Sequence, residues 1–427
     1  MTDRAQVLIV GGGIVGTGLA WALARRGVDG VVVVDLDLAG LYASSELNAG
    51  GARATWWQDV NIESCRVTLD FFRENADEFS FRDVGYLWLY DDADLHRRAL
   101  EVRRRQNAAG LGVEAWSVAD VARRFPLLDR NLDELVGATW SPRDGLVNPN
   151  AVRQGYRARA EALGVTFLNR HYVTGVRTAL HGGAGGVLRR VVSVEAVEVA
   201  RGDPSDEDGT VLGILTGHHV PARAVVREHV IECERVVNSL GAWSPVFSAK
   251  IGVRDVTEPV RRQIALVDVQ SRDLPDPSPL EGLGMVVDAS DLYFHPEGPY
   301  VLAGYSLPDE PPGFDFHYDG EPFFEQEIWP RLAHRASAFE RCGHVRGWSG
   351  LYAVTPDRSG IAGPVAGFSN LCEAHSFTGR GVMQSWGIAN NLASWMASGE
   401  WDDVDLSPLS RDRFEDPARR VEEALHI

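Results

Sequence analysis

A glycine-rich turn near the start of the chain constrains its fold more than any other feature. Residues 11–16 (GGGIVG) have the spacing G-x-G-x-x-G and directly follow the apolar run of residues 6–10 (QVLIV). A helix is expected from this turn to Arg26, and the next apolar run, Val31–Val34, ends at Asp35. A strand, a glycine turn, a helix and a second strand in this order form a βαβ unit that binds a dinucleotide. The sequence therefore predicts a Rossmann-like lobe.

The glycines and the acid of this unit have separate physical roles. Gly11 permits the tight turn, Gly13 lets a pyrophosphate approach the backbone, and Gly16 lets the helix pack against the strand. The helix N-terminus supplies amide donors for the phosphates, and Asp35 can accept hydrogen bonds from ribose hydroxyls. Further cofactor contacts are expected at Ile14, Val15 and Leu36. The motif alone does not decide between FAD and NAD.

Charge and cysteine content exclude several other classes of protein. The chain has 42 basic and 60 acidic residues, a formal charge of −18, which disfavours binding to nucleic acid or an anionic membrane. The four cysteines have no C-x-x-C spacing, which favours a reducing compartment and predicts no metal site. The 18 uncharged residues Val7–Ala24 contain five glycines, so a buried strand-turn-helix is favoured over a membrane span. The expected location is cytoplasmic.

Five segments, taken in order, resemble the FAD-dependent superfamily of D-amino-acid oxidase, glycine oxidase and sarcosine oxidase. They are the N-terminal VLIVGGGIVG, residues 44–53 (SSELNAGGAR), 236–243 (VVNSLGAW), 350–357 (GLYAVTPD) and 375–381 (HSFTGRG). The resemblance runs from residue 6 to about Phe414. It implies an α/β plus α+β fold, with a discontinuous Rossmann-like FAD-binding lobe and an inserted substrate lobe built on a mainly antiparallel sheet.

The resemblance also implies how the chain is divided. The FAD-binding lobe is expected to comprise residues 1–85, 145–250 and 340–414. The substrate lobe is expected to comprise residues 86–144 and 251–339. Residues 415–427 are expected to form an added C-terminal helix.

By motif match, the FAD site is expected to span both ends of the chain. The residues implied beyond the glycine turn are Ser44, Ser45, Asn48, Ala49, Gly50, Gly51, Val173, Gly241, Trp243, Gly379, Arg380, Gly381, Val382 and Met383. Arg380 stands where family members often have histidine. Relatives that attach FAD covalently have Cys at the position of Gly350 or His at that of Asn48, so the resemblance implies non-covalent FAD.

The implied reaction transfers a hydride from the carbon next to a neutral amine to the flavin N5. The imine then hydrolyses to a carbonyl product and a free amine. The substrate is expected to be a glycine-like or sarcosine-like amine with a carboxylate, which arginine binds best. Arg53 is the first candidate for this role, and His375 and Tyr352 are candidate catalytic residues. Substrate contacts are also expected at Trp57, Tyr293, His295 and Tyr305.

Other interpretations remain open at this point. Arg262 could orient substrate or pair with Glu258, and each aromatic candidate could simply pack in the core. An FAD-binding assembly factor or complex subunit without turnover is the main alternative. An aromatic flavin monooxygenase is less favoured, because residues 373–377 (EAHSF) replace the usual Gly-Asp-Ala. The sequence leaves the oligomeric state open.

The chain contains a single lysine, Lys250, which bears on how electrons leave the flavin. In the monomeric sarcosine oxidase branch a strand lysine helps to activate oxygen, and the matching position here is Leu302. Lys250 follows the Gly241–Trp243 motif and is expected at the surface. The electron acceptor is therefore expected to be O2, reacting slowly, or another acceptor.

Overall fold

The strands of the computed structural model fall into two large sheets and one short pair. The structure describes residues 2–183, 186–202, 205–207, 209–270, 280 and 282–424. Its strands are β1 (Thr2–Val10), β2 (Val31–Val34), β3 (Gly51–Ala52), β4 (Tyr86–Tyr90), β5 (Glu114–Trp116), β6 (Gly137–Ser141), β7 (Gly145–Leu146), β8 (Thr166–Leu168), β9 (His171–Gly183), β10 (Gly186–Val199), β11 (Val225–Asn238), β12 (Glu258–Asp268), β13 (Met285–Val287), β14 (Tyr293–Glu297), β15 (Tyr300–Tyr305), β16 (Gly343–Val354), β17 (Ile361–Pro364) and β18 (Leu371–His375).

Helices pack against both of the large sheets. They are α1 (Ile14–Arg25), α2 (Asp59–Glu74), α3 (Ala76–Phe79), α4 (Ala93–Ala108), α5 (Val118–Arg124), α6 (Pro149–Ala162), α7 (Thr210–Gly217), α8 (Ser244–Lys250), α9 (Glu321–Phe323), α10 (Trp329–Arg335) and α11 (Gly381–Ser398). Within the described ranges, no helix combines the length and the apolar character that a membrane crossing requires.

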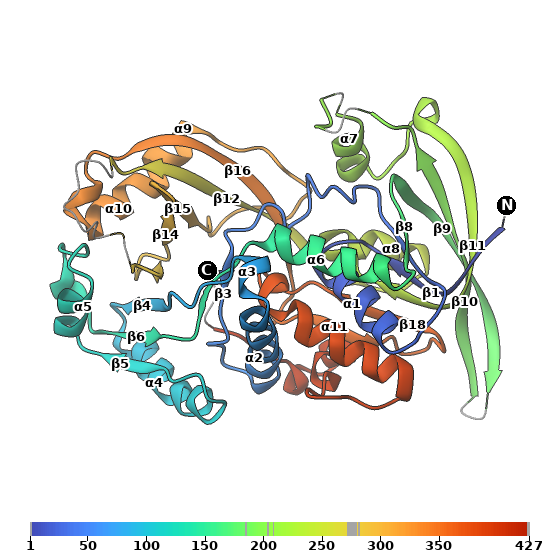
Figure 1. Ribbon diagram of the computed structural model, residues 1–427, viewed down its shortest axis with the longest axis horizontal. Helices are drawn as coiled ribbons and strands as arrows, with labels where there is room; N and C mark the ends of the chain where they lie inside the picture. Colours follow the sequence, from blue (N-terminus) through green and yellow to red (C-terminus); the bar gives the residue numbers. More distant parts are fainter. Residues whose placement is uncertain are drawn as a thin grey trace.

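The first sheet forms the core of one lobe. Its strand order is β17-β18-β11-β1-β2-β8, and β1 pairs in parallel with both β11 and β2. The four valines of β2 suit a parallel strand that is covered on both faces. α1, α6 and α11 lie together on one side of this sheet (Figure 1), and α1 and α11 are almost entirely buried. β9 and β10 extend β11 as a long antiparallel arm at the edge of the lobe.

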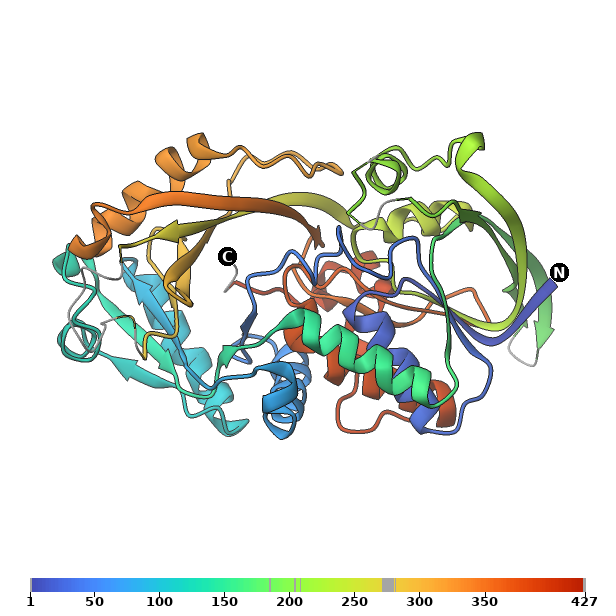
Figure 2. The ribbon, with the colours of Figure 1, turned by 45° about the horizontal axis from the view of Figure 1, so that its top comes forward.

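The second sheet forms the other lobe. Its order is β16-β12-β15-β14-β13-β4-β6-β5, and every pair is antiparallel except β13 with β4. The long strands β12 and β16 run from this lobe towards the first one (Figure 2). The predicted fold class, a Rossmann-like lobe with a mainly antiparallel substrate lobe, is confirmed.

One lobe boundary differs from the expected one. Residues 340–414 were expected to lie in the FAD-binding lobe, yet β16 pairs with β12 along almost its whole length. β16 therefore belongs to the second sheet, and the chain returns to the first sheet only at β17. The mismatch arises because the motif at residues 350–357 lies where the end of β16 reaches the other lobe.

The expected C-terminal helix over 415–427 is wrong for the residues that the structure describes. Short 3₁₀ turns at Arg411–Glu415 and Pro417–Arg419 are followed by an irregular segment to Ala424. Residues 425–427 lie outside the described residues. The backbone N–H groups of Val421 and Glu423 donate to Asp357 instead of to a helical neighbour. Docking to the rest of the protein thus replaces the internal hydrogen bonds of a helix.

Candidate active site

A deep cavity lies between the two lobes. Its walls come from the glycine turn, the ends of β1 and β2, the start of α11 and the facing strands of the second sheet. A crevice at the carboxyl ends of parallel strands is where α/β proteins bind their ligands. The sequence-predicted residues that line it are Gly11, Gly13, Ile14, Val15, Asp35, Leu36, Ser44, Ser45, Asn48, Ala49, Gly51, Arg53, Val173, Gly241, Trp243, Tyr293, Tyr352, His375, Gly379, Gly381, Val382 and Met383.

The glycine turn has the geometry that its spacing predicts. Gly11 has a φ of +109°, and a Cβ on it would collide with the carbonyl of Ser239. A Cβ on Gly16 would collide with the carbonyl of Gly11, so α1 packs closely on the turn without Gly16 reaching the cavity. A Cβ on Gly13 would point into open space. The turn thus leaves room beside the N-terminus of α1, which has no side-chain cap.

Asp35 lies at the end of β2 and holds the turn from the other side. Its carboxylate accepts hydrogen bonds from the backbone N–H groups of Gly12 at 2.5 Å and Asp37 at 2.7 Å. Burial raises the pKa of Asp35 above its ordinary value, although these two hydrogen bonds oppose the effect. Asp35 therefore shapes the phosphate turn in addition to facing the cavity.

The N-terminus of α11 forms the opposite wall. The preceding residues Ser376, Thr378 and Gly379 all have positive φ angles, of 61°, 46° and 81°. Two non-glycine residues in this region indicate strain that the surrounding contacts must hold. The ring of Tyr352 packs on Gly379, where a Cβ would lie 2.6 Å from the ring. α11 also has no side-chain cap, so its first amide groups remain available at the cavity wall.

Arg53 is buried, and aromatic rings hold its guanidinium. The guanidinium carbon lies 3.4 Å from the ring centre of Trp56 and 4.6 Å from that of Trp88. One of its amino groups donates to the carbonyl of Thr55 at 2.8 Å. Burial lowers the pKa of Arg53 to about 10, so the group remains charged at neutral pH. Cation–π contacts on two rings fix its position in the wall.

Arg262 is another cavity arginine, for which the sequence left open a substrate role or an ion pair with Glu258. It lies on β12 and shares the cavity face with Ile264, two residues along the strand. Its guanidinium carbon lies 5.4 Å from the ring centre of Tyr352, and one amino group donates to the carbonyl of Arg261 at 2.9 Å. Its Nε is buried and has no hydrogen-bond partner among the described residues. No ion pair with Glu258 is present among those residues.

Three tyrosines from different strands complete this part of the wall. Tyr86 of β4 and Tyr293 of β14 line the cavity together with Tyr352 of β16. Burial raises the pKa of all three phenols above their ordinary value. The phenols therefore stay neutral and can donate hydrogen bonds. The sequence motifs do not indicate Tyr86 or its neighbour Met285, because only the parallel pairing of β4 with β13 brings them to this face.

His375 lies in the wall within a buried network of charged groups. Its Nδ1 lies 2.6 Å from the hydroxyl of Ser376, and its Nε2 lies 3.3 Å from a carboxylate oxygen of Glu373. Arg411 binds Glu373 through two nitrogens and also reaches Asp255 at 3.1 Å. Burial opposes the charged form of Asp255, but the charges of His375 and Arg411 hold its pKa at about 2. Both ring nitrogens of His375 are thus engaged within the protein.

Several predicted residues do not line the cavity. Trp57 stacks on Arg98, with the guanidinium carbon 4.6 Å from its ring centre, while its neighbour Trp56 takes the cavity position. The Nε2 of His295 lies 2.9 Å from the carbonyl of Ala49, so this histidine supports the cofactor loop from behind. Tyr305 stacks on Arg331 at 3.8 Å on the opposite face of the second sheet.

Two residues of the expected cofactor loops also lie outside the cavity wall. Gly50 does not line the cavity, and Arg380 is buried against Trp56 with its guanidinium on the carbonyl of Arg358.

Lys250 was expected at the surface. It is half-buried and lines the cavity beside Phe247, because α8 turns back along β9.

The fold and the cavity together define a two-lobed dinucleotide-binding protein whose second sheet closes over the binding site. The family of FAD dependent oxidoreductases (DAO) matches residues 6–395, so the chain belongs to this family. Its membership confirms the expected superfamily and FAD as the cofactor, and the chain is an FAD-dependent oxidoreductase.

Individual relatives cover the same length of chain. The FAD-dependent oxidoreductase domain-containing protein 1 of Bos taurus is 28% identical over 96% of this chain and 85% of that protein. The mitochondrial dimethylglycine dehydrogenase of Homo sapiens is 24% identical over 95% of this chain, but over only 44% of its own length. The solved structure of L-proline dehydrogenase from P. horikoshii aligns with a TM-score of 0.77 at 21% identity, covering 98% of this chain and 99% of that one.

The geometry of the cavity fits FAD independently of these comparisons. Positions for a Cβ on Gly13, Gly241 and Gly381 all face open space, so the backbone leaves room for a large ligand. The hydroxyl of Ser45 is buried at the cavity wall without a hydrogen-bond partner among the described residues. Two uncapped helix N-termini face the same space, and such termini bind phosphates and stabilise negative charge.

Proposed function

We propose that the chain oxidises the carbon–nitrogen bond of a small amine that carries a carboxylate, such as an amino acid or an N-substituted amino acid. Bound FAD supplies the hydride acceptor for this chemistry. The observation that carries the proposal is the cation on β12: the Nε of Arg262 is buried at the cavity wall without a partner among the described residues. A buried charged group of this kind requires a ligand or a counter-charge.

The residues of the second sheet perform the binding step. Arg262 binds the substrate carboxylate, because a guanidinium can donate two parallel hydrogen bonds to its oxygens. The neutral phenols of Tyr86, Tyr293 and Tyr352 supply further donors around it. Arg53 adds positive charge from a fixed position on Trp56. Apolar Ile264 and Met285 keep water from the same wall.

No residue of this wall is free to act as a general base in the described structure. Both nitrogens of His375 are engaged by Ser376 and Glu373, and the three phenols are kept neutral by burial. The amine therefore has to enter uncharged, and positioning of its C–H bond accounts for the rate. The imine product then hydrolyses to a carbonyl compound and a free amine. The dimethylglycine dehydrogenase among the relatives supports a substrate of this class.

Anaerobic reduction of the bound flavin tests this proposal. The purified flavoprotein is mixed with dimethylglycine, sarcosine, glycine or L-proline, and separately with the amines that lack the carboxylate: trimethylamine, dimethylamine, methylamine and pyrrolidine. We expect at least one carboxylate-bearing amine to bleach the flavin absorbance, and its carboxylate-free partner to react at least tenfold more slowly.

Other outcomes identify the alternatives. Bleaching by NADH or NADPH and by none of the amines would indicate a flavin monooxygenase. A flavin that none of these compounds reduces would indicate an assembly factor or a complex subunit without turnover. Equal reduction by amines with and without a carboxylate would contradict the role given to Arg262.

A further inference from the structure

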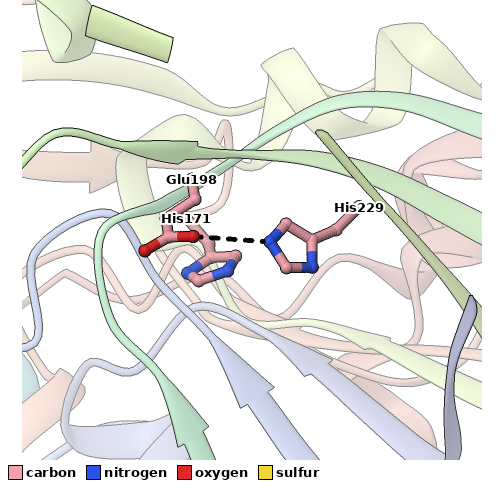
Figure 3. A group of neighbouring side chains, drawn as sticks. All are labelled: His171, Glu198 and His229. Atoms are coloured by element: carbon pink, nitrogen blue, oxygen red, sulfur yellow. Dashed lines mark ion pairs between the residues drawn. The ribbon is translucent and has the colours of Figure 1, made fainter. Parts of the chain in front are cut away.

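Three polar side chains meet on one face of the antiparallel arm of β9, β10 and β11. Glu198 of β10 stands directly opposite His171 of β9, and His229 of β11 stands opposite Ala196, two residues from Glu198 on the same face. Figure 3 shows the two imidazoles and the carboxylate turned towards one another. One nitrogen of each histidine and one oxygen of Glu198 all lie within 4.8 Å of one another.

The outer nitrogen of each histidine is engaged by an acceptor. The Nδ1 of His171 lies 2.7 Å from the carbonyl oxygen of Asn169, and the Nδ1 of His229 lies 3.0 Å from a carboxylate oxygen of Asp3 on β1. A carbonyl or carboxylate oxygen can only accept, so each Nδ1 carries the proton. The lone pair of a ring that carries this one proton is on Nε2, the nitrogen that faces the cluster.

Both inner nitrogens are buried and unsatisfied. The Nε2 atoms of His171 and His229 have no hydrogen-bond partner among the described residues, and His171 is only 8% exposed. The Nε2 of His229 lies 3.7 Å from a carboxylate oxygen of Glu198, too far for a hydrogen bond. Two buried acceptors and a carboxylate converge here without a donor between them, and a bound cation would satisfy all three.

We propose that His171, Glu198 and His229 bind one divalent transition-metal ion, with Zn²⁺ as the ion that best suits the ligands. Two imidazoles and one carboxylate are a ligand set that zinc takes, and three protein ligands leave a fourth position for water. Ligand atoms around a tetrahedral zinc ion lie about 3.4 Å apart, given bonds of roughly 2.0–2.2 Å. Small side-chain rotations therefore close the present arrangement around an ion.

The contacts of Asn169 and Asp3 match the second layer of a zinc site. Histidines that bind zinc donate their other N–H to a carbonyl or a carboxylate, which fixes the ring and its proton. The cysteine content predicted no metal site, but this ligand set contains no thiolate. His171 also lines the cavity near Val173, so the ion links three strands beside the cofactor-binding space. Its binding does not depend on the proposed reaction.

Calorimetric titration of the intact flavoprotein with Zn²⁺, after chelator treatment and desalting, tests the proposal. We expect one equivalent of Zn²⁺ per chain, and visible absorption bands of a tetrahedral complex when Co²⁺ is used instead. His171→Ala and His229→Ala should each weaken the binding of Zn²⁺ at least tenfold. The second-layer variant Asp3→Asn should weaken it by about 10–100-fold. His181→Ala, an exposed histidine on the same strand β9, should bind Zn²⁺ like the unaltered protein.

Flavin content and far-UV circular dichroism show whether each variant is folded. If an alanine variant does not fold, Glu198→Gln and Asp3→Asn give the same comparison with little change in side-chain volume. The proposal is overturned if the unaltered protein binds Zn²⁺ no more tightly than the folded variants, or if His181→Ala weakens binding as much as His171→Ala. Flavin reduction by amines is measured separately, so failure of the metal site leaves the proposed function untouched.

Discussion

At the scale of single residues, the cavity arginines Arg53 and Arg262 differ in what holds them. Arg53 is fixed between Trp56 and Trp88, where its planar group has aromatic neighbours. Among the described residues, Arg262 contacts a carbonyl of its own strand and, at a greater distance, the ring of Tyr352. A guanidinium with an unsatisfied buried Nε gains most from a carboxylate ligand. Arg262 is therefore assigned to the substrate, and Arg53 to the wall.

The buried network around His375 makes stability depend on pH. The folded-state pKa of Asp255, about 2, lies below its ordinary value of 3.8. Because the pKa of this carboxylate is lower in the folded protein, its charge stabilises the fold at pH values above the pKa of the unfolded chain. This stabilisation is lost as the pH falls towards 2. We expect Asp255→Asn to cost about 2 kcal/mol of unfolding free energy at pH 6. Denaturant unfolding should show this difference shrinking as the pH falls from about 4 to about 2; a difference that stays constant would contradict the role of the charge.

We predict a slow reaction of the reduced flavin with O2, because the chain has a leucine at the position of the lysine that activates oxygen in some relatives. The resemblance places Leu302 there, and this side chain does not line the cavity. Lys250 does line it, beside α8 residues of the FAD-binding lobe. We expect the reduced flavin to be reoxidised slowly by O2 in stopped-flow mixing, and Lys250→Met to leave that rate within a factor of two. A large decrease in the variant would show that Lys250 activates oxygen.

At the scale of elements, the C-terminal segment acts as a cap for α2. The carboxylate of Glu423 accepts hydrogen bonds from the backbone N–H groups of Trp57 and Gln58 and from the side chain of Asn61. α2 has no side-chain cap of its own from Gln58. A carboxylate near a helix N-terminus stabilises the helix dipole, and here it comes from 365 residues further along the chain.

This contact predicts a local effect on stability. Glu423→Gln removes the charge and places an amide donor against N–H groups, so we expect a loss of about 2 kcal/mol. Glu422→Gln is the matched control, because Glu422 is exposed and its neighbour Glu423 is buried. Thermal unfolding followed by flavin fluorescence compares the two variants. Equal melting temperatures for both would show that the tail contributes nothing through Glu423.

At the scale of the whole molecule, we expect the cofactor to contact both ends of the chain without a covalent bond to either. Gly350 and Asn48 line the cavity at the positions where covalently flavinylated relatives have a Cys or a His. We expect acid precipitation to release all the yellow chromophore into the supernatant. The absorbance of pellet and supernatant measures this, and flavin retained in the pellet would contradict it.

Sequence motifs predicted the fold class and most of the cavity wall, because the motifs are local. Residues 11–16 and 379–383 are turns that begin helices, and such turns keep the same relation to the cofactor wherever the chain goes next. Tyr86 and Met285 could not be found in this way, and the role of Arg262 could not be decided. Their place depends on which strands pair and on which face each residue takes, and that pairing is non-local.

The same reason explains the other differences between expectation and structure. The His171–Glu198–His229 cluster depends on the register of three strands, and that register shifts between Glu195 and Ala196. Trp57 follows the cavity residue Trp56, and Tyr305 follows Gly304, which pairs with the cavity residue Ile264, so alternation along the chain turned both side chains away. The tail is irregular because its groups form hydrogen bonds with Asp357 and with the residue Trp57 before α2, in place of the internal hydrogen bonds of a helix.

The central claim is that Arg262 recognises the carboxylate of an amine substrate, and stopped-flow reduction of the flavin tests it most directly. The best amine of the panel and its carboxylate-free partner are each mixed with the unaltered protein, with Arg262→Gln, and with the control Arg346→Gln, whose arginine is exposed on β16.

We predict that Arg262→Gln raises the dissociation constant of the carboxylate-bearing amine by roughly 10–100-fold, as expected for a lost charge-assisted hydrogen bond. Its effect on the carboxylate-free amine should be less than threefold, and Arg346→Gln should change neither. A similar loss for both amines, or no loss for either, would contradict the account.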